Sequence, residues 1–360
     1  GMVSGGVNVG KRYISKPLPP AEAAPFVSDA ADSFTHVENL IAREKIDCSW
    51  TKAGYFLGAW CRSHYDAMAK KISVLNESAN SDAFLVPEER QREEIGSDYY
   101  RGGMVVARAA HIHPALYFKG LLGLVKKREI PIASKTAVTM LTSQGNGWLV
   151  ETSRGSFSAG DVIIATNGYT GDVTPQLKRR VVPVGSYIIA TEELPPDIAR
   201  SLSPKNRSFA DTRRVLTYYR MSPDGKRLIF GGRAKFGHTD PVETAPILYR
   251  FMTDRYPQLA GVKITHAWTG NVAFTIDELP HMGRFDNLHY ALGCNGSGVA
   301  MMSYLGHQTG LKIAGKVNRI CAFDREEFPT HPLYTGNTWF LPWIGRYFRT
   351  RDWIDRNIVG

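Results

Sequence analysis

The segment at residues 292–304 constrains this chain more than any other, because it places Gly293, Gly296 and Gly298 directly before an apolar stretch of helical character. Glycine adopts unusual backbone angles at little cost and lets a ligand approach the main chain closely. A helix that starts here would direct backbone N–H groups and the positive end of its dipole at that ligand. Residues 286–292 read as a turn and a buried strand. Together these elements predict a site for an anionic or electron-rich group, although packing alone also produces such turns.

The composition is that of a globular protein. The chain has 360 residues, of which 43% are hydrophobic and 22% are charged, and its formal net charge is +10. A chain of this length is expected to form about two domains. The basic residues are scattered apart from short runs at 178–180 and 346–351, and no nucleic-acid-binding signature is visible. A solvated basic face therefore explains the charge better than a nucleic-acid partner.

The cysteines and the apolar segments indicate where in the cell the protein is expected. Cys48, Cys61, Cys294 and Cys321 show no C-x-x-C spacing, which favours reduced thiols and a cytoplasmic location. The sequence has no run of about 18 apolar residues that would span a bilayer, and no signal peptide is visible. The aromatic and basic residues 330–360 could touch a membrane interface. Packing onto the body is the favoured interpretation, so we expect no membrane contact.

Apolar periodicity predicts the main elements. Helices are expected at 29–46 and 114–128, and three short strands within 136–158. Residues 161–165 form a continuous apolar strand, which is typical of a position buried on both faces. Residues 181–275 are rich in strands, with clear alternation of polar and apolar residues. This region predicts a sheet domain that interrupts the first domain.

Seven segments occur in an order that indicates a known family. They are 103–114, 161–169, 211–220, 230–233, 268–274, 277–280 and 293–298. Together they resemble the family of FAD-dependent amine and D-amino-acid oxidases, and most closely its gamma-glutamylputrescine oxidoreductase branch. No single segment is decisive, but the ordered set covers nearly the whole chain.

The resemblance implies a mixed α/β fold of two domains. The expected segments are 1–48, 96–175 and 276–330 for a discontinuous FAD-binding domain, 49–95 and 176–275 for an antiparallel-sheet substrate domain, and 331–360 for a C-terminal segment packed on the body. The family opens with a strand, a G-x-G-x-x-G turn and a helix that bind the FAD pyrophosphate, and the sequence lacks this unit. The chain starts at Gly1 with residues that resemble the family's next glycine loop. We therefore expect either a piece of a longer enzyme or a shortened protein that binds flavin weakly or not at all.

The resemblance also assigns the cofactor contacts. In this family a hydride equivalent moves to flavin N5 while negative charge accumulates on the N1–C2=O edge of the ring. The helix that follows the glycine turn is expected to stabilise this charge. The expected FAD contacts are Gly1, Met2, Val3, Val138, Ala165, Thr166, Asn167, Gly168, Gly293, Asn295, Gly296, Ser297, Gly298, Val299, Ala300 and Met301. Cys294 could suggest a covalent flavin link, but a packed thiol is the better interpretation.

The expected substrate residues follow from the same resemblance. Tyr218, Tyr219 and Arg220 share a strand whose alternation lets only one side face the flavin, and Tyr219 is the favoured residue. Arg233 is expected to be catalytic, as a cation that assists oxygen reduction or as a bidentate ligand of a carboxylate. The residues expected to bind substrate are Tyr55, Tyr219, Trp268 and Asn271.

The implied function is oxidation of a primary or secondary amine to an imine. The amine would be gamma-glutamylputrescine-like or amino-acid-like, and O2 would be the electron acceptor. Two alternatives stay open: a non-catalytic fragment or subunit that keeps the fold, and a dehydrogenase that passes electrons to a quinone or a protein. The oligomeric state is also open. His111 and His113 are spaced like metal ligands, but no acidic residue or cysteine stands nearby, so we expect no metal site.

Overall fold

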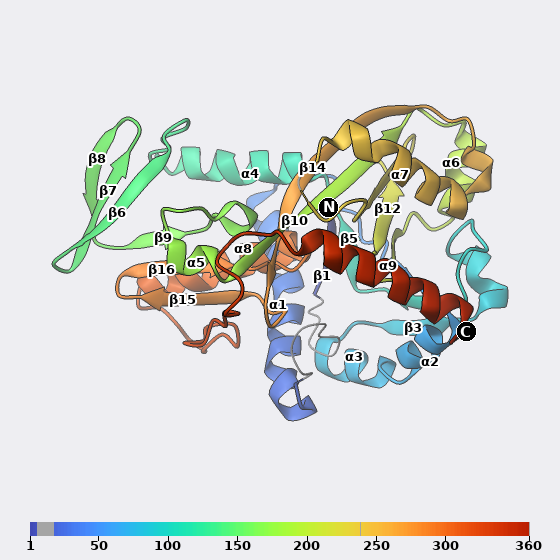
Figure 1. Ribbon diagram of the computed structural model, residues 1–360, viewed down its shortest axis with the longest axis horizontal. Coiled ribbons are helices and arrows are strands. Elements are labelled where there is room, and N and C mark those ends of the chain that lie inside the picture. Colours follow the sequence, from blue (N-terminus) through green and yellow to red (C-terminus); the bar gives the residue numbers. More distant parts are fainter. Residues whose placement is uncertain (6–17, 238, 360) are drawn as a thin grey trace.

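The computed structural model describes residues 1–5, 18–237 and 239–359 and has two lobes that meet in a central region (Figure 1). A large sheet forms the lobe at the right of Figure 1, and smaller sheets with long helices form the lobe at the left. The C-terminal helix, drawn in red, crosses the front of the molecule.

The large sheet has eight strands in the order β14-β10-β13-β12-β11-β2-β4-β3. Their bounds are β2 (Tyr55–Gly58), β3 (Ala83–Val86), β4 (Gly103–Val106), β10 (Val181–Thr191), β11 (Ser208–Asp211), β12 (Thr217–Met221), β13 (Leu228–Gly232) and β14 (Ile264–Thr275). All neighbours in this sheet pair antiparallel, as expected, except β11 and β2, which pair parallel. Because β4 pairs with both β2 and β3, the chain stays in this sheet as far as Val106.

One face of the large sheet is covered by α7 (Pro241–Arg255) and forms the main hydrophobic core. Tyr219 and Phe230 stack on adjacent strands of this face with ring centroids 4.8 Å apart, and Leu248 of α7 packs in the same cluster. At the β3–β4 end, α2 (Arg62–Ala69) and α3 (Ile72–Ala79) pack on the opposite face. That opposite face is only half-buried on β10, β12 and β13, where Ser186, Tyr218 and Ile229 lie.

The other lobe is built around a three-stranded sheet. β16 (Leu288–Leu292) lies between β15 (His281–Phe285), which is antiparallel to it, and β9 (Val162–Ile164), which is parallel. After the glycine turn, α8 (Gly298–Ile313) packs against α1 (Pro20–Glu44). The remaining elements, apart from the C-terminal helix, are β1 (Met2–Ser4), η1 (Glu88–Glu93), β5 (Ala109–His111), α4 (Pro114–Lys127), β6 (Val138–Gln144), β7 (Gly147–Thr152), β8 (Gly155–Ala159), η2 (Asn167–Tyr169), α5 (Pro175–Lys178), α6 (Pro196–Leu202) and η3 (Pro257–Leu259).

Local patterns predict some of these elements better than others. The helix expected at 114–128 agrees with α4 to one residue, since Pro114 occupies its first turn. The prediction that residues 161–165 are buried on both faces is wrong: β9 is an edge strand, and Ile163 is 48% exposed. Among the described residues no helix combines the length and the apolar character that crossing a membrane requires.

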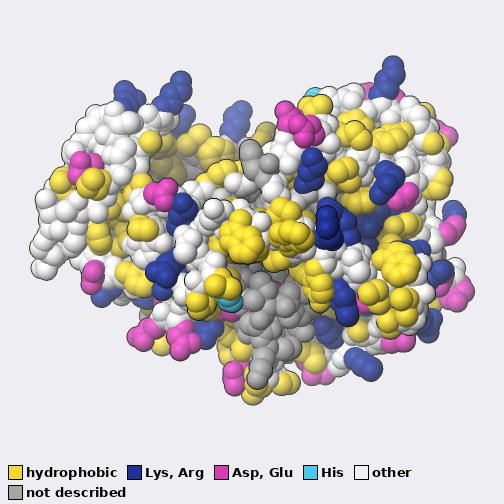
Figure 2. Space-filling view, viewed as in Figure 1, with side chains coloured by type: hydrophobic (Ala, Val, Ile, Leu, Met, Phe, Trp, Pro, Cys, Tyr) yellow, Lys and Arg dark blue, Asp and Glu magenta, His cyan; other side chains and the backbone are white. Residues whose placement is uncertain are grey.

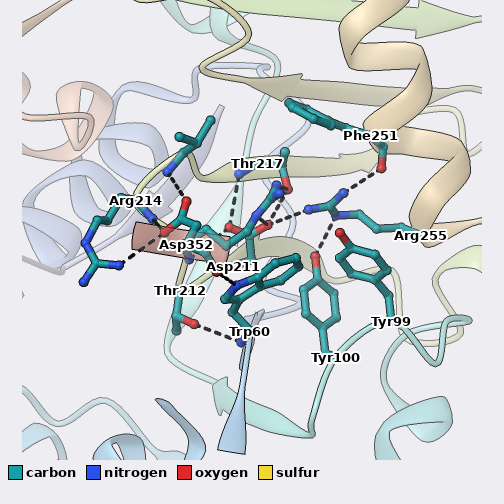
Figure 3. Close-up of polar contacts among 12 residues, drawn as sticks. Trp60, Tyr99, Tyr100, Asp211, Thr212, Arg214, Thr217, Phe251, Arg255 and Asp352 are labelled. Atoms are coloured by element: carbon teal, nitrogen blue, oxygen red, sulfur yellow. Dashed lines mark hydrogen bonds and ion pairs between the residues drawn. The ribbon is translucent and has the colours of Figure 1, made fainter. Parts of the chain in front are cut away.

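Helix α9 (Leu341–Asn357) is attached to the large-sheet lobe by two buried carboxylates on its inner face, those of Asp352 and Asp355 (Figure 3). Asp352 accepts hydrogen bonds from the backbone N–H groups of Arg214 and Val215, each at 2.9 Å. Its backbone carbonyl accepts a hydrogen bond from Trp60 Nε1 at 2.6 Å. Asp355 forms an ion pair with Arg214. These contacts join α9 to the chain segment that leads into β12.

A second buried network, also drawn in Figure 3, joins β11 and β12 to α7. Asp211 accepts hydrogen bonds from Thr217 Oγ1 at 2.6 Å and from Arg255 Nη2 at 2.8 Å. Arg255 Nε also donates to the hydroxyl of Tyr100 at 2.9 Å. Burial alone would raise the pKa of Asp211, but Arg213 and Arg255 beside it hold that pKa below its usual value. The carboxylate therefore stays ionised inside the core.

Asp352→Ala is expected to lower the free energy of unfolding by about 2–4 kcal/mol, because a buried and a partly buried backbone N–H group lose their shared acceptor. Denaturant-induced unfolding measures this change. Asp172→Ala is the control, since it removes only an exposed ion pair with Lys178 and should cost less than about 1 kcal/mol. Equal effects of the two substitutions would contradict the role given to Asp352.

Candidate cofactor and substrate site

The glycine turn between β16 and α8 has left-handed backbone geometry. Gly293, Asn295 and Gly296 have φ angles of 80°, 45° and 96°. A Cβ on Gly293 would lie 2.3 Å from Thr275 Cγ2, so this position has no room for a side chain, whereas a Cβ on Gly296 would meet no atom within 4 Å. Gly296 therefore lies on the open side of the turn, where a ligand can approach the main chain.

The first turn of α8 presents backbone N–H groups toward the turn. Ser297 N donates to Cys294 O at 2.8 Å, and Met301 N donates to Ser297 O at 3.0 Å. The N–H groups of residues 298–300 precede the first hydrogen bond within the helix, so they and the helix dipole create a positive site. Met301 does not fit its expected role as an FAD contact, because its N–H is used within the helix and its side chain is fully buried in the core.

Two asparagines hold the turn in place. Asn167 Oδ1, from η2, accepts hydrogen bonds from Gly293 N at 3.1 Å and from Cys294 N at 3.3 Å. Asn295 Oδ1 accepts a hydrogen bond from Thr275 N at 3.1 Å. The turn is thus attached to the segment after β9 on one side and to the end of β14 on the other.

The strand β1 lies beside the first turn of α8. Gly1 and Ile112 exchange two backbone hydrogen bonds, of 3.0 and 2.9 Å. A Cβ on Gly1 would lie 3.3 Å from Val299 Cγ2. The expected cofactor residues that the structure brings together here are Gly1, Met2, Val3, Val299 and Ala300.

The other expected cofactor residues lie in two further segments. Ala165 and Thr166 are exposed at the end of β9, directly before η2. Gly168 is buried against β14, where a Cβ would lie 2.6 Å from Asn271 O. Val138 begins β6 in a separate three-stranded sheet, so no strand pairing joins it to the glycine turn.

The half-buried face of the large sheet carries a polar group. Tyr218 lies opposite Gly231 on this face, and its hydroxyl hydrogen-bonds with Ser186 Oγ. A Cβ on Gly231 would lie 2.3 Å from the Tyr218 ring, so the glycine makes room for the ring. Tyr219 points the other way, is 2% exposed and stacks on Phe230. Tyr219 is the residue expected to face the ligand, but α7 covers its side of the sheet, whereas Tyr218 lies on the half-buried face.

Arg233 follows β13 on the same face as Tyr218. Its Nη1 donates to Arg214 O at 3.2 Å, and its Cζ lies 4.6 Å from the centroid of the Phe274 ring. The residues on both sides of Phe274 hydrogen-bond to Asn295 of the glycine turn. Strand β14 therefore connects the surroundings of Arg233 directly to the turn.

The structure separates the other expected substrate residues. Trp268 lies in one cross-strand row with Tyr218 and is 41% exposed. Asn271, three residues later, faces the other side of β14 by alternation, and its backbone N donates to the Tyr169 hydroxyl at 3.2 Å. Tyr55 shares the face of Tyr218 but packs with the α2–α3 cluster, two strands away. Of these three, only Trp268 joins the group around Tyr218.

A buried cation with neutral partners lies between the sheet and β5. Arg220 donates to His111 Nδ1 at 2.8 Å and to Ile112 O at 2.7 Å. Because Nδ1 accepts, the His111 ring is neutral, and its Nε2 donates to Asn206 O at 3.2 Å. Burial and the charge of Arg220 lower the pKa of His111 to about 4. Within the described ranges no group of three or more His, Cys, Asp and Glu residues could hold a metal ion.

Ser186 and Arg220 are the site residues that the sequence analysis misses. Ser186 is the one residue between Val181 and Ala190 with a polar aliphatic side chain, and this signal could have marked it. Arg220 shares the face of Tyr218 by alternation, so the correct choice between the two tyrosines would have found it.

A glycine turn that presents a helix N-terminus is an arrangement that can stabilise a ligand with an electron-rich edge. Residues 1–310 match the model of the DAO family, described as FAD dependent oxidoreductase, and the chain belongs to this family. It is 31% identical to gamma-glutamylputrescine oxidoreductase of Escherichia coli (strain K12), over 88% of this chain and 74% of that protein. It is 30% identical to the probable oxidoreductase OrdL of Haemophilus influenzae, over 82% of this chain and 68% of that protein.

Solved structures share the fold. Glycine oxidase from Geobacillus kaustophilus superposes with a TM-score of 0.75 at 17% identity, and the match covers 92% of this chain and 87% of that one. L-proline dehydrogenase from P. horikoshii superposes with a TM-score of 0.70 at 17% identity, covering 87% and 83%. The mixed α/β architecture is therefore that of FAD-dependent oxidoreductases, as the sequence analysis expects.

Asn167→Ala is expected to weaken FAD binding by roughly 10- to 100-fold, because Gly293 N and Cys294 N lose their common acceptor and the turn loosens. Titration of the protein with FAD, followed by flavin fluorescence, measures the affinity. Asn337→Ala, at an exposed asparagine outside the turn, serves as the control and should leave FAD binding unchanged. An alanine variant with unchanged affinity would show that the turn does not need Asn167.

Acidification is expected to destabilise the protein through His111. The unfolded chain takes up a proton as the pH falls below about 6.5, whereas folded His111 takes one up only near pH 4. Stability is therefore lost as the pH falls from 7 to 4, by up to about 3 kcal/mol from this residue. Denaturant unfolding at several pH values measures the slope.

His111→Gln should flatten that slope, although not completely, because burial also lowers the pKa of His36 to about 4. The exposed His331 gives the control, since His331→Gln should leave the curve in place. An unchanged slope in the His111 variant would contradict this account.

Proposed function

We propose that this chain oxidises a primary or secondary amine that also carries a carboxylate. The main support is a connection between two parts of the structure. One part is the sheet face that carries Tyr218, Ser186 and Arg233. Arg233 contacts Phe274 of β14, and the neighbours of Phe274 on that strand hydrogen-bond to the glycine turn. The relative gamma-glutamylputrescine oxidoreductase is named for a substrate with amine character, which agrees with an amine substrate here.

The residues of the turn fit the flavin ring of FAD, but they supply no counterpart of the G-x-G-x-x-G unit that binds the pyrophosphate in this family. The N–H groups of residues 298–300 offer donors to an electron-rich edge, and Gly296 leaves the approach open. When bound, FAD supplies the electron acceptor for the oxidation. The protein itself provides a positive electrostatic potential at that edge before the reaction starts. Its N–H groups therefore need not reorient when negative charge develops on the ring.

Tyr218 and Ser186 are proposed to orient the amine. Burial raises the pKa of Tyr218, and the Ser186 hydroxyl and the charge of Arg233 offset this only in part. Tyr218 therefore stays protonated at neutral pH, and its hydroxyl can donate or accept one hydrogen bond to a substrate nitrogen. Trp268, in the same row of the sheet, provides an apolar wall for the carbon chain of the substrate.

Arg233 is proposed to bind the substrate carboxylate. A guanidinium forms two parallel hydrogen bonds to a carboxylate, which fixes both position and direction. Its contact with the Phe274 ring keeps the guanidinium plane in place beside Tyr218. A gamma-glutamylated amine has both groups, the carboxylate at one end and the oxidised amine at the other.

Stopped-flow spectroscopy of the FAD-loaded protein tests the proposal. Anaerobic addition of a gamma-glutamylated diamine should bleach the visible flavin band, and admission of O2 should restore it with release of peroxide. Restoration only by a quinone or a protein acceptor would make the enzyme a dehydrogenase. A flavin band that no amine bleaches would reject amine oxidation and leave a non-catalytic role.

Arg233→Ala should raise KM for a carboxylate-bearing amine roughly 30-fold, because a charged hydrogen-bonding partner is lost. The same variant should change KM for the corresponding diamine without a carboxylate by less than about threefold. Steady-state kinetics with the two substrates measures both values. Arg179→Ala, at an exposed arginine, is the control. Equal losses on both substrates would contradict carboxylate binding.

A further inference from the structure

The outer face of α9 exposes large aromatic side chains. Trp343 and Trp353 are 65% and 58% exposed, and Tyr347 is similarly exposed. At 3.6 residues per turn these three side chains lie on one side of the helix. Trp339, in the turn before α9, is also exposed. Exposed tryptophans gathered on one helix face are unusual, because burying them would contribute strongly to stability.

The inner face of the same helix explains why α9 is fixed but not why its outer face is aromatic. Asp352 and Asp355 are buried against Arg214, and a Cβ on Gly345 would lie 2.5 Å from Phe236 Cδ2. The helix therefore cannot turn to bury its tryptophans. Packing on the body, which the sequence analysis favours for this segment, accounts only for the inner side.

The exposed charges of α9 are all positive. Arg346, Arg349 and Arg351 are exposed, whereas both acidic residues of the helix are buried. Arg346 Cζ lies 5.5 Å from the centroid of the Trp343 ring, so charge and aromatic surface are adjacent. Figure 2 shows hydrophobic side chains and Lys or Arg side chains next to one another along the path that α9 follows in Figure 1.

We propose that this face of α9 docks on the surface of an anionic lipid bilayer. Tryptophan and tyrosine favour the boundary between lipid headgroups and acyl chains, because each ring has an apolar body and a polar edge. Arginines near an anionic bilayer gain attraction from its negative surface potential. A helix held parallel to the protein surface presents both groups to a flat partner at once.

Charge complementarity selects the lipid surface over a second copy of the chain. A symmetric dimer through this face would bring together two surfaces whose exposed charges are all positive, and like charges oppose that contact. The proposed contact is at the bilayer surface, because the inner face of α9 is held on the protein by Asp352 and Asp355. The inference does not depend on the proposed amine oxidation.

Co-sedimentation with vesicles tests the proposal. The FAD-loaded protein should bind vesicles of phosphatidylcholine and phosphatidylglycerol at low ionic strength, and binding should fall as salt is added. It should bind pure phosphatidylcholine vesicles much less. Brominated lipids should quench part of the tryptophan fluorescence, which reports insertion to the depth of the interface.

Two variants locate the contact. Arg346→Glu reverses one charge and should weaken binding to anionic vesicles roughly tenfold, and Trp343→Ser with Trp353→Ser should weaken it at least as much. Phe118→Ser and Arg154→Glu change exposed side chains elsewhere and should leave binding intact. Circular dichroism and flavin content check that each variant is folded.

Failure to bind anionic vesicles overturns the proposal, and so does binding that neither α9 variant weakens. Concentration-dependent dimerisation without vesicle binding would also overturn it, in favour of a second copy on this face. Loss of vesicle binding in both α9 variants, with the flavin content and the fold unchanged, supports it.

Discussion

The hydrogen bond from Gly293 N to Asn167 Oδ1 joins parts of the chain that are 126 residues apart in sequence. A turn rich in glycine is costly to order, because its main chain has many accessible conformations when free. Asn167 on one side and Asn295 on the other remove that freedom. The start of α8 is thereby fixed, and its first N–H groups point to one defined place.

The large sheet divides the lobe into two electrostatic environments. On the side of α7, Asp211 lies between Arg213 and Arg255, so two buried guanidinium groups share one carboxylate inside the core. On the other side, Arg220 is bound only to neutral groups in its hydrogen bonds with His111 and Ile112. That side is also the side of Tyr218. A positive potential next to an electron-rich cofactor is what oxidation chemistry of this kind needs.

Local sequence signals predict only part of this arrangement. The glycine turn and α4 have short-range causes, a run of glycines and a proline at a helix start, and both are found where expected. The choice between Tyr218 and Tyr219 depends on which face α7 covers, and α7 is distant in sequence. The place of β4 depends on pairing with β2 and β3, and the exposure of β9 depends on its edge position. Such contacts are set by the tertiary fold. The alternation of residues along a strand shows which side chains share a face, but it does not show which face is covered.

The most direct test of this account is a crystal structure of the FAD-loaded protein. The account predicts that the N1–C2=O edge of the isoalloxazine ring accepts hydrogen bonds from backbone N–H groups of residues 298–300, with the Tyr218 side of the large sheet over the ring. A ring that binds elsewhere, with the first turn of α8 facing solvent, would contradict it.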